Sequence, residues 1–193
     1  HPETAWQEWE TMEFIENELH KMGLETYRFD NEHTGGWAWI RGGKGGPNKK
    51  AILLRAEIDA LPVQEKNDDI PYKSIYPNRM HACGHDFHMA SVLGATMLLR
   101  EQKNLPGTVR LIFQPAEEGV RGAKSVVDKG HLDDVDFVIG NHISNRSAKA
   151  GDAELIPGIY SSLATTTLAV GYKGKASHAG AAPPLGNTAL LAA

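Results

Sequence analysis

The chain is poor in cysteine, in long apolar runs and in excess charge of either sign. Cys83 is its single cysteine, so no disulfide can form within the chain, which fits a reducing compartment or a metal site. No apolar run reaches the roughly 20 residues that a membrane-spanning helix needs. The formal net charge of -4 over 193 residues gives no sign of a nucleic-acid-binding or membrane-binding surface. These absences predict a cytoplasmic protein without nucleic-acid or membrane partners.

The sequence also lacks an initiator Met and a signal-peptide pattern, and it begins with His1. Its last residues, 187–193, are typical of a helix that is cut within a turn. These features predict a fragment of a longer protein, and 193 residues allow one domain plus part of another. The texture changes after Pro157-Gly158, so we expect an incomplete first domain at 1–160 and the beginning of a second at 161–193.

Hydrophobic periodicity predicts an α/β protein. Trp and Met residues at helical spacing predict an amphipathic helix that a capping box at Thr4 and Gln7 would start and Gly23 would end. Further helices are predicted at 89–99 and 122–129. Strands are predicted at 24–29, 36–40, 51–56, 108–113, 135–140 and 163–170, with a hairpin tip at 41–50. The runs at 51–56 and 135–140 are apolar enough for strands buried in a sheet.

The stretch from Met80 to His88 contains the cysteine and three of the nine histidines. Sulfur, imidazole and carboxylate groups this close together suit a transition metal better than calcium or magnesium. A buried thiol, a polar helix start or a chance run of histidines would look the same. His85, Asp86 and His88 would lie at the N-terminal end of the second helix. For His88 we favour an ordinary polar residue of the first turn.

Three predicted strands carry polar residues at their C-terminal ends. Sites assemble at such strand ends in open α/β sheets, so we expect these side chains to meet the cysteine cluster. A solvated loop start is the alternative for the acids after 51–56, and a structural role is the alternative for a lone histidine. The residues are Glu57 and Asp59 after 51–56, Glu117 and Glu118 after 108–113, and His142 after 135–140.

These residues suit hydrolysis assisted by a pair of divalent ions. Glu117 would be the general base that takes a proton from water and passes it to the leaving nitrogen. Asp59 could hold His85 in one tautomer. Four ligands are one or two too few for two ions, which again predicts missing sequence. The candidate ligands are Cys83, His85, Glu118 and His142.

A competing interpretation makes Cys83 a nucleophile with a nearby histidine as its base. Cys83 and His85 are too close in sequence to be oriented comfortably for these roles. The interpretation also leaves Glu117, Glu118 and His142 without functions.

Five motifs occur in the order found in the M20 metallopeptidases, and they span the whole chain. The sequence most resembles the amidohydrolase branch of that family, which includes hippurate hydrolase, N-acyl-amino-acid deacylases and auxin-conjugate hydrolases. Within the branch, the stretches 118–123, 127–130, 133–136, 164–166 and 187–193 resemble the A subunits of aminobenzoyl-glutamate hydrolases. The five motifs are RAEIDALP at 55–62, MHACGHD at 80–86, FQPAEEG at 113–119, NH at 141–142 and SHAG at 177–180.

The resemblance implies a three-layer α/β/α zinc-peptidase-like catalytic domain, followed by the start of an inserted α+β, ferredoxin-like dimerisation domain. It implies two divalent ions, Zn²⁺ or Mn²⁺, with Cys83 as the bridging ligand and a further histidine ligand beyond residue 193. His178 would lie in the inserted domain and polarise the scissile carbonyl in a partner subunit's site. A homodimer or hetero-oligomer is therefore expected. Many M20 peptidases have His where this chain has Glu57, a departure that is common in the amidohydrolase branch.

The expected activity is metal-dependent hydrolysis of the amide bond of a small N-acyl amino acid, with aminobenzoyl among the candidate acyl groups. The alternative is an inactive fragment or degenerate homologue that binds metal or a partner without turnover. The presence of Glu117 argues against degeneration, and the missing C-terminal half argues for an inactive fragment.

Overall fold

The computed structural model describes residues 1–42, 50–102, 104–119, 121–144, 158, 168–182 and 185–191. The chain forms two compact units, His1–Arg146 and Ser147–Ala193, and each is described by itself. The helices of the first unit are α1 (Trp9–Lys21), α2 (His85–Arg100) and α3 (Gly122–Asp128). Its strands are β1 (Thr26–Arg28), β2 (Gly36–Arg41), β3 (Ala51–Glu57), β4 (Thr108–Gln114) and β5 (Phe137–Gly140).

The five strands form one mixed sheet in the order β1-β2-β4-β3-β5. The strands β4, β3 and β5 run parallel, whereas β1 and β2 are antiparallel to their neighbours. In the register, Glu57 pairs with Gln114 and Arg55 with Gly140. The three parallel strands therefore end at the same edge of the sheet, and the polar residues that follow them are brought together.

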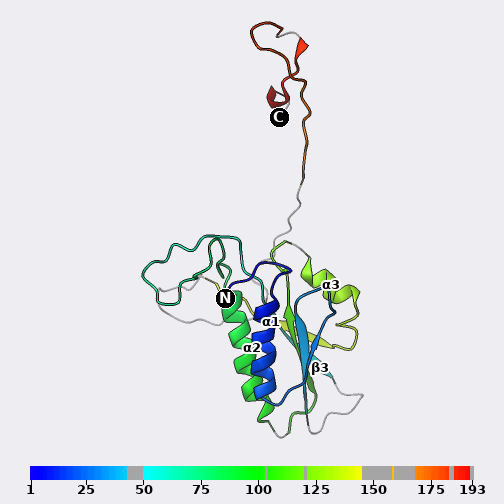
Figure 1. The fold of residues 1–193 in the computed structure, drawn as a ribbon. Helices are drawn as coiled ribbons and strands as arrows, with labels where there is room; N and C mark the ends of the chain where they lie inside the picture. Colours follow the sequence, from blue (N-terminus) through cyan, green and yellow to red (C-terminus); the bar gives the residue numbers. More distant parts are fainter. Residues whose placement is uncertain are drawn as a thin grey trace. The chain divides into compact units, whose positions relative to one another are not determined.

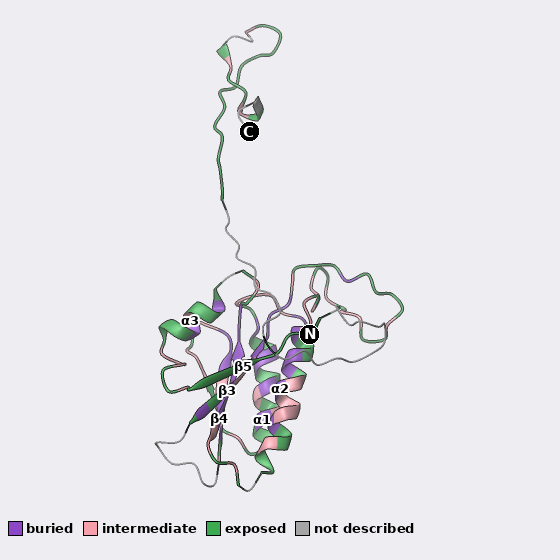
Figure 2. Cartoon of the chain, turned by 180° about the vertical axis from the view of Figure 1, so that it is seen from behind, coloured by how far each residue is buried: buried purple, intermediate pink, exposed green. Residues whose placement is uncertain are grey.

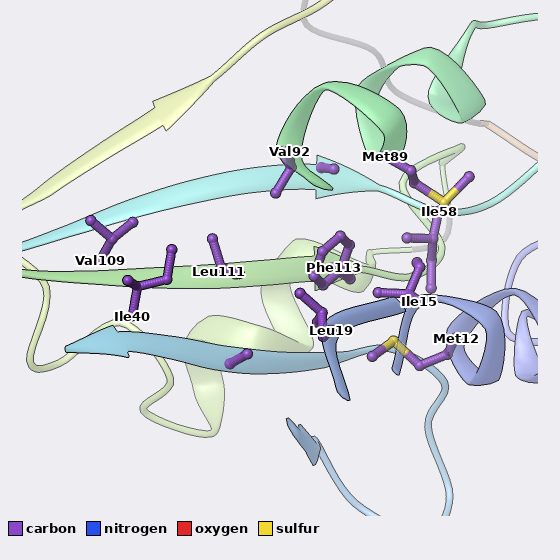
Figure 3. Packing of buried hydrophobic residues seen from close by; sticks show 12 residues of the cluster. Met12, Ile15, Leu19, Ile40, Ile58, Met89, Val92, Val109, Leu111 and Phe113 are labelled. Atoms are coloured by element: carbon purple, nitrogen blue, oxygen red, sulfur yellow. The ribbon is translucent and has the colours of Figure 1, made fainter. Parts of the chain in front are cut away.

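Two apolar clusters cover the two faces of the sheet. On one face, side chains of α1 and α2 pack against β2, β3 and β4, and Phe113 of β4 is fully buried among them (Figure 3). Figure 1 shows α1 and α2 side by side, with α3 apart from them. Val126 of α3 packs with Leu53 and Ile112 in a second cluster. The first unit therefore confirms the predicted three-layer α/β/α fold.

The first helix begins later than its sequence pattern predicted. Thr4 forms a β-bridge with Ala60, and α1 starts only at Trp9. The carboxylate of Glu3 accepts hydrogen bonds from the first-turn N–H groups of Glu10 (3.3 Å) and Thr11 (2.7 Å). Glu3 therefore caps the helix in place of the predicted capping box. The predicted stop is confirmed, because Gly23 follows the helix with a φ of 75°.

The strand predicted to be buried at 135–140 is shorter and exposed. All four residues of β5 are exposed (Figure 2): the strand lies at the edge of the described sheet, and none of its residues belongs to either apolar cluster. Ile52 on β3 is also 38% exposed, so β3 is not buried throughout. The assumption that an apolar run means burial on both faces failed here, since it ignored where a strand stands in the sheet.

The second unit contains few described elements. Lys175 forms a β-bridge with Asn187, and residues Ala189–Leu191 form a 3₁₀ helix where a terminal α-helix was predicted. The predicted strand at 163–170 and the hairpin tip at 41–50 lie largely outside the described residues. Among the described helices, none combines the length and apolar character that crossing a membrane requires.

Candidate metal centre

The four predicted ligands converge at the carboxyl edge of the sheet. Cys83 Sγ lies 3.4 Å from His142 Nε2, although the two residues are 59 positions apart. His85 Nε2 lies 3.9 Å from Glu118 Oε1 and 3.7 Å from Glu117 Oε2. Ligand atoms of Cys83, His85 and His142 fall within 4.8 Å of one another, as do those of His85, Glu117 and Glu118. His85 is common to both groups and stands at the centre of the cluster.

Gly84 allows the start of α2 to approach the segment after β5. It has a φ of 82° and precedes the first helical residue. A Cβ at this position would lie 2.4 Å from Cγ2 of Ile143. Only glycine accommodates both the left-handed backbone and the close approach, which bring Cys83 and His142 together.

Asp59 determines which nitrogen of His85 is free. His85 Nδ1 lies 2.8 Å from the Asp59 main-chain oxygen and 3.2 Å from its Oδ1. Donation from Nδ1–H to the carbonyl leaves Nε2 as the bare nitrogen. Burial acts against the charged imidazole, but the Asp59 contacts outweigh it and raise the pKa of His85.

The Asp59 carboxylate also fixes the main chain of the acidic pair. Its Oδ2 accepts the Glu118 N–H at 3.0 Å. Burial acts to raise the pKa of Asp59, but the His85 contact and the main-chain donors at Glu117 and Glu118 lower it overall. An ionised Asp59 therefore connects the histidine at the centre of the cluster to the loop after β4.

The two adjacent acids have different surroundings. The Glu117 side chain is 39% exposed, and burial together with the negative charge of Glu118 raises its pKa. A carboxylate with a raised pKa that remains accessible is suited to proton transfer. Glu118 instead has a buried Oε1 that makes no hydrogen bond within the described part of the chain.

The loop that carries these acids is pinned through its backbone. Ala116 has a φ of 49°, which is unusual for a residue with a side chain. Its N–H donates to Glu8 Oε1 at 2.9 Å, and its carbonyl accepts the Gly122 N–H at 3.0 Å. Glu8 is fully buried and also accepts a hydrogen bond from the Thr34 hydroxyl.

The environment of Cys83 disfavours its use as a nucleophile. Its contact with His142 is a possible thiol–imidazole pair. However, burial, followed by the hydrogen bond and negative charge of Glu118, raises the pKa of Cys83 to about 12. Reactive cysteines need the opposite shift, so a cation beside the sulfur is required to produce a thiolate here.

The donor set fits a transition-metal ion. Zinc bonds of 2.0–2.3 Å in tetrahedral geometry place neighbouring ligand atoms roughly 3.3–3.8 Å apart, near the 3.4 Å and 3.9 Å separations found here. His85 Nε2 and Glu118 Oε1 are both buried, and neither has a hydrogen-bond partner among the described residues. Leaving such atoms unpaired is costly, and a divalent ion between them would remove the cost.

The structure buries both acids that follow the strand predicted at 51–56, and it corrects the interpretation of His88. Glu57 is 3% exposed rather than part of a solvated loop, and Asp59 is 1% exposed. His88 is fully buried, so our interpretation of it as an ordinary first-turn residue was wrong. It contacts Glu57 and the main chain of Ile143. Glu8 was missed, although it precedes Met12, Ile15 and Leu19 on the apolar stripe of α1, where a carboxylate is out of place.

His178 belongs to the second unit. Its Nδ1 accepts the N–H groups of Gly180 (3.1 Å) and Ala181 (2.9 Å), which closes a local turn. Its function in a partner subunit's site stays a prediction.

Comparison with known proteins matches the motifs and the fold to one family. The profile of peptidase family M20/M25/M40 matches residues 53–193. An N-acetyl-L-cysteine deacetylase of Bacillus subtilis is 49% identical over 74% of this chain and 33% of its own length. A Haemophilus influenzae homolog of the A subunit of p-aminobenzoyl-glutamate hydrolase is 44% identical over 83% of this chain and 38% of its own length. The chain thus spans about a third of the length of these relatives.

A solved structure supports the same relationship. A dinuclear metal-binding peptidase of the M20 family from Bacillus subtilis superimposes with a TM-score of 0.69 at 43% identity. The match covers 75% of this chain and 39% of that protein.

Proposed function

The chain belongs to peptidase family M20/M25/M40, and from that premise we propose that it carries most of the metal centre of an amidohydrolase that cleaves N-acyl amino acids. One observation carries the proposal. Four potential ligands lie close together; they come from the segments after β4 and β5 and from the segment at the start of α2. Two of their ligand atoms, His85 Nε2 and Glu118 Oε1, are buried and lack hydrogen-bond partners among the described residues.

The ligands in this proposal are Cys83, His85, Glu118 and His142. When bound, a pair of Zn²⁺ or Mn²⁺ ions would polarise the amide carbonyl and acidify a water molecule. The thiolate of Cys83 would balance part of their charge as a bridging ligand. The donor set suits either metal. A similar solved structure is that of a dinuclear metal-binding peptidase, which supports a site for two ions.

Glu117 would act as the proton carrier of the site. Its raised pKa keeps it basic enough to accept a proton from water and acidic enough to give it to the leaving nitrogen. Asp59 would keep His85 in the tautomer with a bare Nε2, and it would hold the Glu118 backbone through Oδ2. These assignments give the two adjacent acids separate functions.

The proposed substrates are small N-acyl amino acids. The relatives include deacetylases of N-acetylcysteine, hydrolases of IAA–amino acids and an aminobenzoyl-glutamate hydrolase homolog. The match to the last relative extends over more of this chain than the other two, which favours aminobenzoyl-glutamate among the substrates to be assayed first.

A cytoplasmic, oligomeric protein is part of the same proposal. Residues from about 161 would begin a dimerisation domain, and His178 would serve the site of a partner subunit. The alternative is a chain that binds metal or a partner without turnover, which the presence of Glu117 next to Glu118 disfavours.

Two neighbouring substitutions in the full-length protein test the proposal. Glu117→Gln should retain the metal and reduce turnover by about 10²–10⁴-fold, because it removes only the proton carrier. Glu118→Gln should reduce metal content itself. Hydrolysis of N-acetyl and aminobenzoyl amino acids is measured beside metal analysis, with the exposed Glu101→Gln as the control. Turnover that survives chelation but not alkylation of Cys83 would instead support a thiol hydrolase.

A further inference from the structure

His88 connects three parts of the candidate metal centre. It lies on the first turn of α2, three residues after His85, and is fully buried. Its Nδ1 lies 3.0 Å from Glu57 Oε2 at the end of β3. Its Nε2 lies 2.8 Å from the backbone nitrogen of Ile143, the residue after His142. A single imidazole therefore joins α2, β3 and the segment after β5.

These two contacts define the tautomer of His88. The Ile143 N–H can only donate, so Nε2 must be the acceptor and carry no proton. The proton is then on Nδ1, where it is donated to the Glu57 carboxylate. Arg55 contacts the other oxygen of that carboxylate. Burial acts to raise the pKa of Glu57, but His88 and Arg55 lower it to about 2, so Glu57 is an ionised acceptor.

The ring of His88 also packs against both neighbouring histidines. Ring centroids are 4.5 Å apart for His88 and His142 and 5.4 Å apart for His88 and His85. His142 itself is exposed, and its Nδ1 lies 2.6 Å from the main-chain oxygen of the adjacent Ile143. The buried ring beside it is thus the rigid body against which the exposed ligand rests.

We propose that His88 is a positioning residue that holds His142 at the correct distance from Cys83 and His85. This inference rests on the proposed function, because it assumes that His142 is a ligand. A competing possibility is that His88 is itself a ligand, since Glu57, His85 and His88 also present ligand atoms within 4.8 Å. The hydrogen bonds argue against this, because both of its ring nitrogens are already engaged.

Two substitutions separate the bonds. Asn can place an amide near the position of Nδ1 and keep the donor to Glu57, but it leaves the Ile143 N–H without an acceptor. Gln can place an oxygen near the position of Nε2 and keep that acceptor, but it weakens the contact to Glu57. Both lose the ring, so His88→Asn and His88→Gln form a matched pair.

Zn²⁺ binding to the 193-residue chain is measured by competition with a chromophoric chelator, and hydrogen exchange of the Ile143 amide is measured without metal. We expect His88→Asn to weaken Zn²⁺ binding by about 10–100-fold and to accelerate Ile143 exchange by at least about tenfold. His88→Gln should recover most of both effects. Wild-type behaviour of both variants would overturn the proposal. So would equal losses of Zn²⁺ affinity with unchanged Ile143 exchange, the result expected of a ligand.

Nitrogen NMR of the wild-type imidazoles provides a test that does not depend on the variants folding. His88 should be protonated on Nδ1 and not on Nε2, and its Nε2 signal should keep its shift when Zn²⁺ is added, whereas that of His142 should move. A proton on His88 Nε2, or a zinc-induced shift comparable to that of His142, would refute the inference. Failure to hydrolyse any amide would refute the proposed function and leave these measurements unaffected.

Discussion

Removing the buried carboxylate of Glu8 should destabilise the first unit and disturb the loop that carries Glu117. Glu8 is fully buried at the N-terminal end of α1. Its two oxygens accept hydrogen bonds from the Ala116 N–H and the Thr34 hydroxyl. Through these bonds one side chain connects α1, the start of β2 and the loop after β4.

The magnitude follows from the donors that would lose their partner. A buried donor without an acceptor costs about 1–3 kcal/mol. Glu8→Ala leaves two such donors, so the loss of these hydrogen bonds would lower the free energy of unfolding by about 2–6 kcal/mol. Removing a carboxylate that is itself costly to bury offsets part of this loss. We therefore expect the free energy of unfolding to fall by about 2–4 kcal/mol at neutral pH. Glu8→Gln retains an acceptor and should lose less.

The pH dependence has a definite sign. Burial is the largest influence on Glu8 and raises its pKa above the ordinary value of 4.5. The stabilising effect of the protonated form is thus complete below pH 4.5 and is lost as the pH rises through the pKa of the folded state. Gln stays neutral, so the stability of Glu8→Gln relative to wild type should improve as the pH rises through this window.

Urea unfolding followed by tryptophan fluorescence is the appropriate assay. The four tryptophans are at positions 6, 9, 37 and 39, so the signal reports the first unit. Glu13→Ala, at an exposed position of α1, is the control and should change stability by less than about 0.5 kcal/mol. A Glu8→Ala protein as stable as this control would refute the reasoning.

Three further outcomes are expected. Since Glu57 has a pKa of about 2 against an ordinary 4.5, its stabilising effect is complete above pH 4.5 and is lost as the pH falls toward 2, so Glu57→Gln should flatten the acid-unfolding curve in that window. Zn²⁺ should raise the melting temperature and a chelator should reverse the change, whereas Cys83→Ser should lose most of the response; an equal response in both proteins would contradict metal binding at the sulfur. Gly122→Ala would place a Cβ 1.7 Å from the Pro115 carbonyl oxygen, so we expect a lower melting temperature and weaker Zn²⁺ binding; wild-type values would show that the loop is not as tightly fixed.

The sequence predicted the order of helices and strands in the first unit, because hydrophobic period and glycine punctuation are local signals. It also predicted that the candidate ligands would lie together, since the ends of parallel strands converge wherever the intervening chain goes. Gly23 as a helix stop and His85 at a helix start needed no tertiary information.

Other features depend on tertiary contacts that local patterns do not encode. The exposure of β5 depends on what packs against its edge and its faces, and its composition gave no sign of an uncovered edge position. The start of α1 is set by Glu3 and by the Thr4–Ala60 bridge, which involves residues far apart in sequence. The function of His88 depends on contacts with residues 31 and 55 positions away. Glu8 alone left a usable signal, a carboxylate on the apolar stripe of a helix.

The most direct test of the account is the absorption spectrum of the cobalt-substituted chain. Cys83 is the only cysteine, so a thiolate-to-cobalt charge-transfer band can arise only from that sulfur. We expect the band to form as Co²⁺ is added, to vanish in Cys83→Ser, and to require a higher Co²⁺ concentration in His142→Ala, because these two ligand atoms lie 3.4 Å apart. Cobalt binding without this band would contradict the claim that sulfur, imidazole and carboxylate ligands meet at one metal centre.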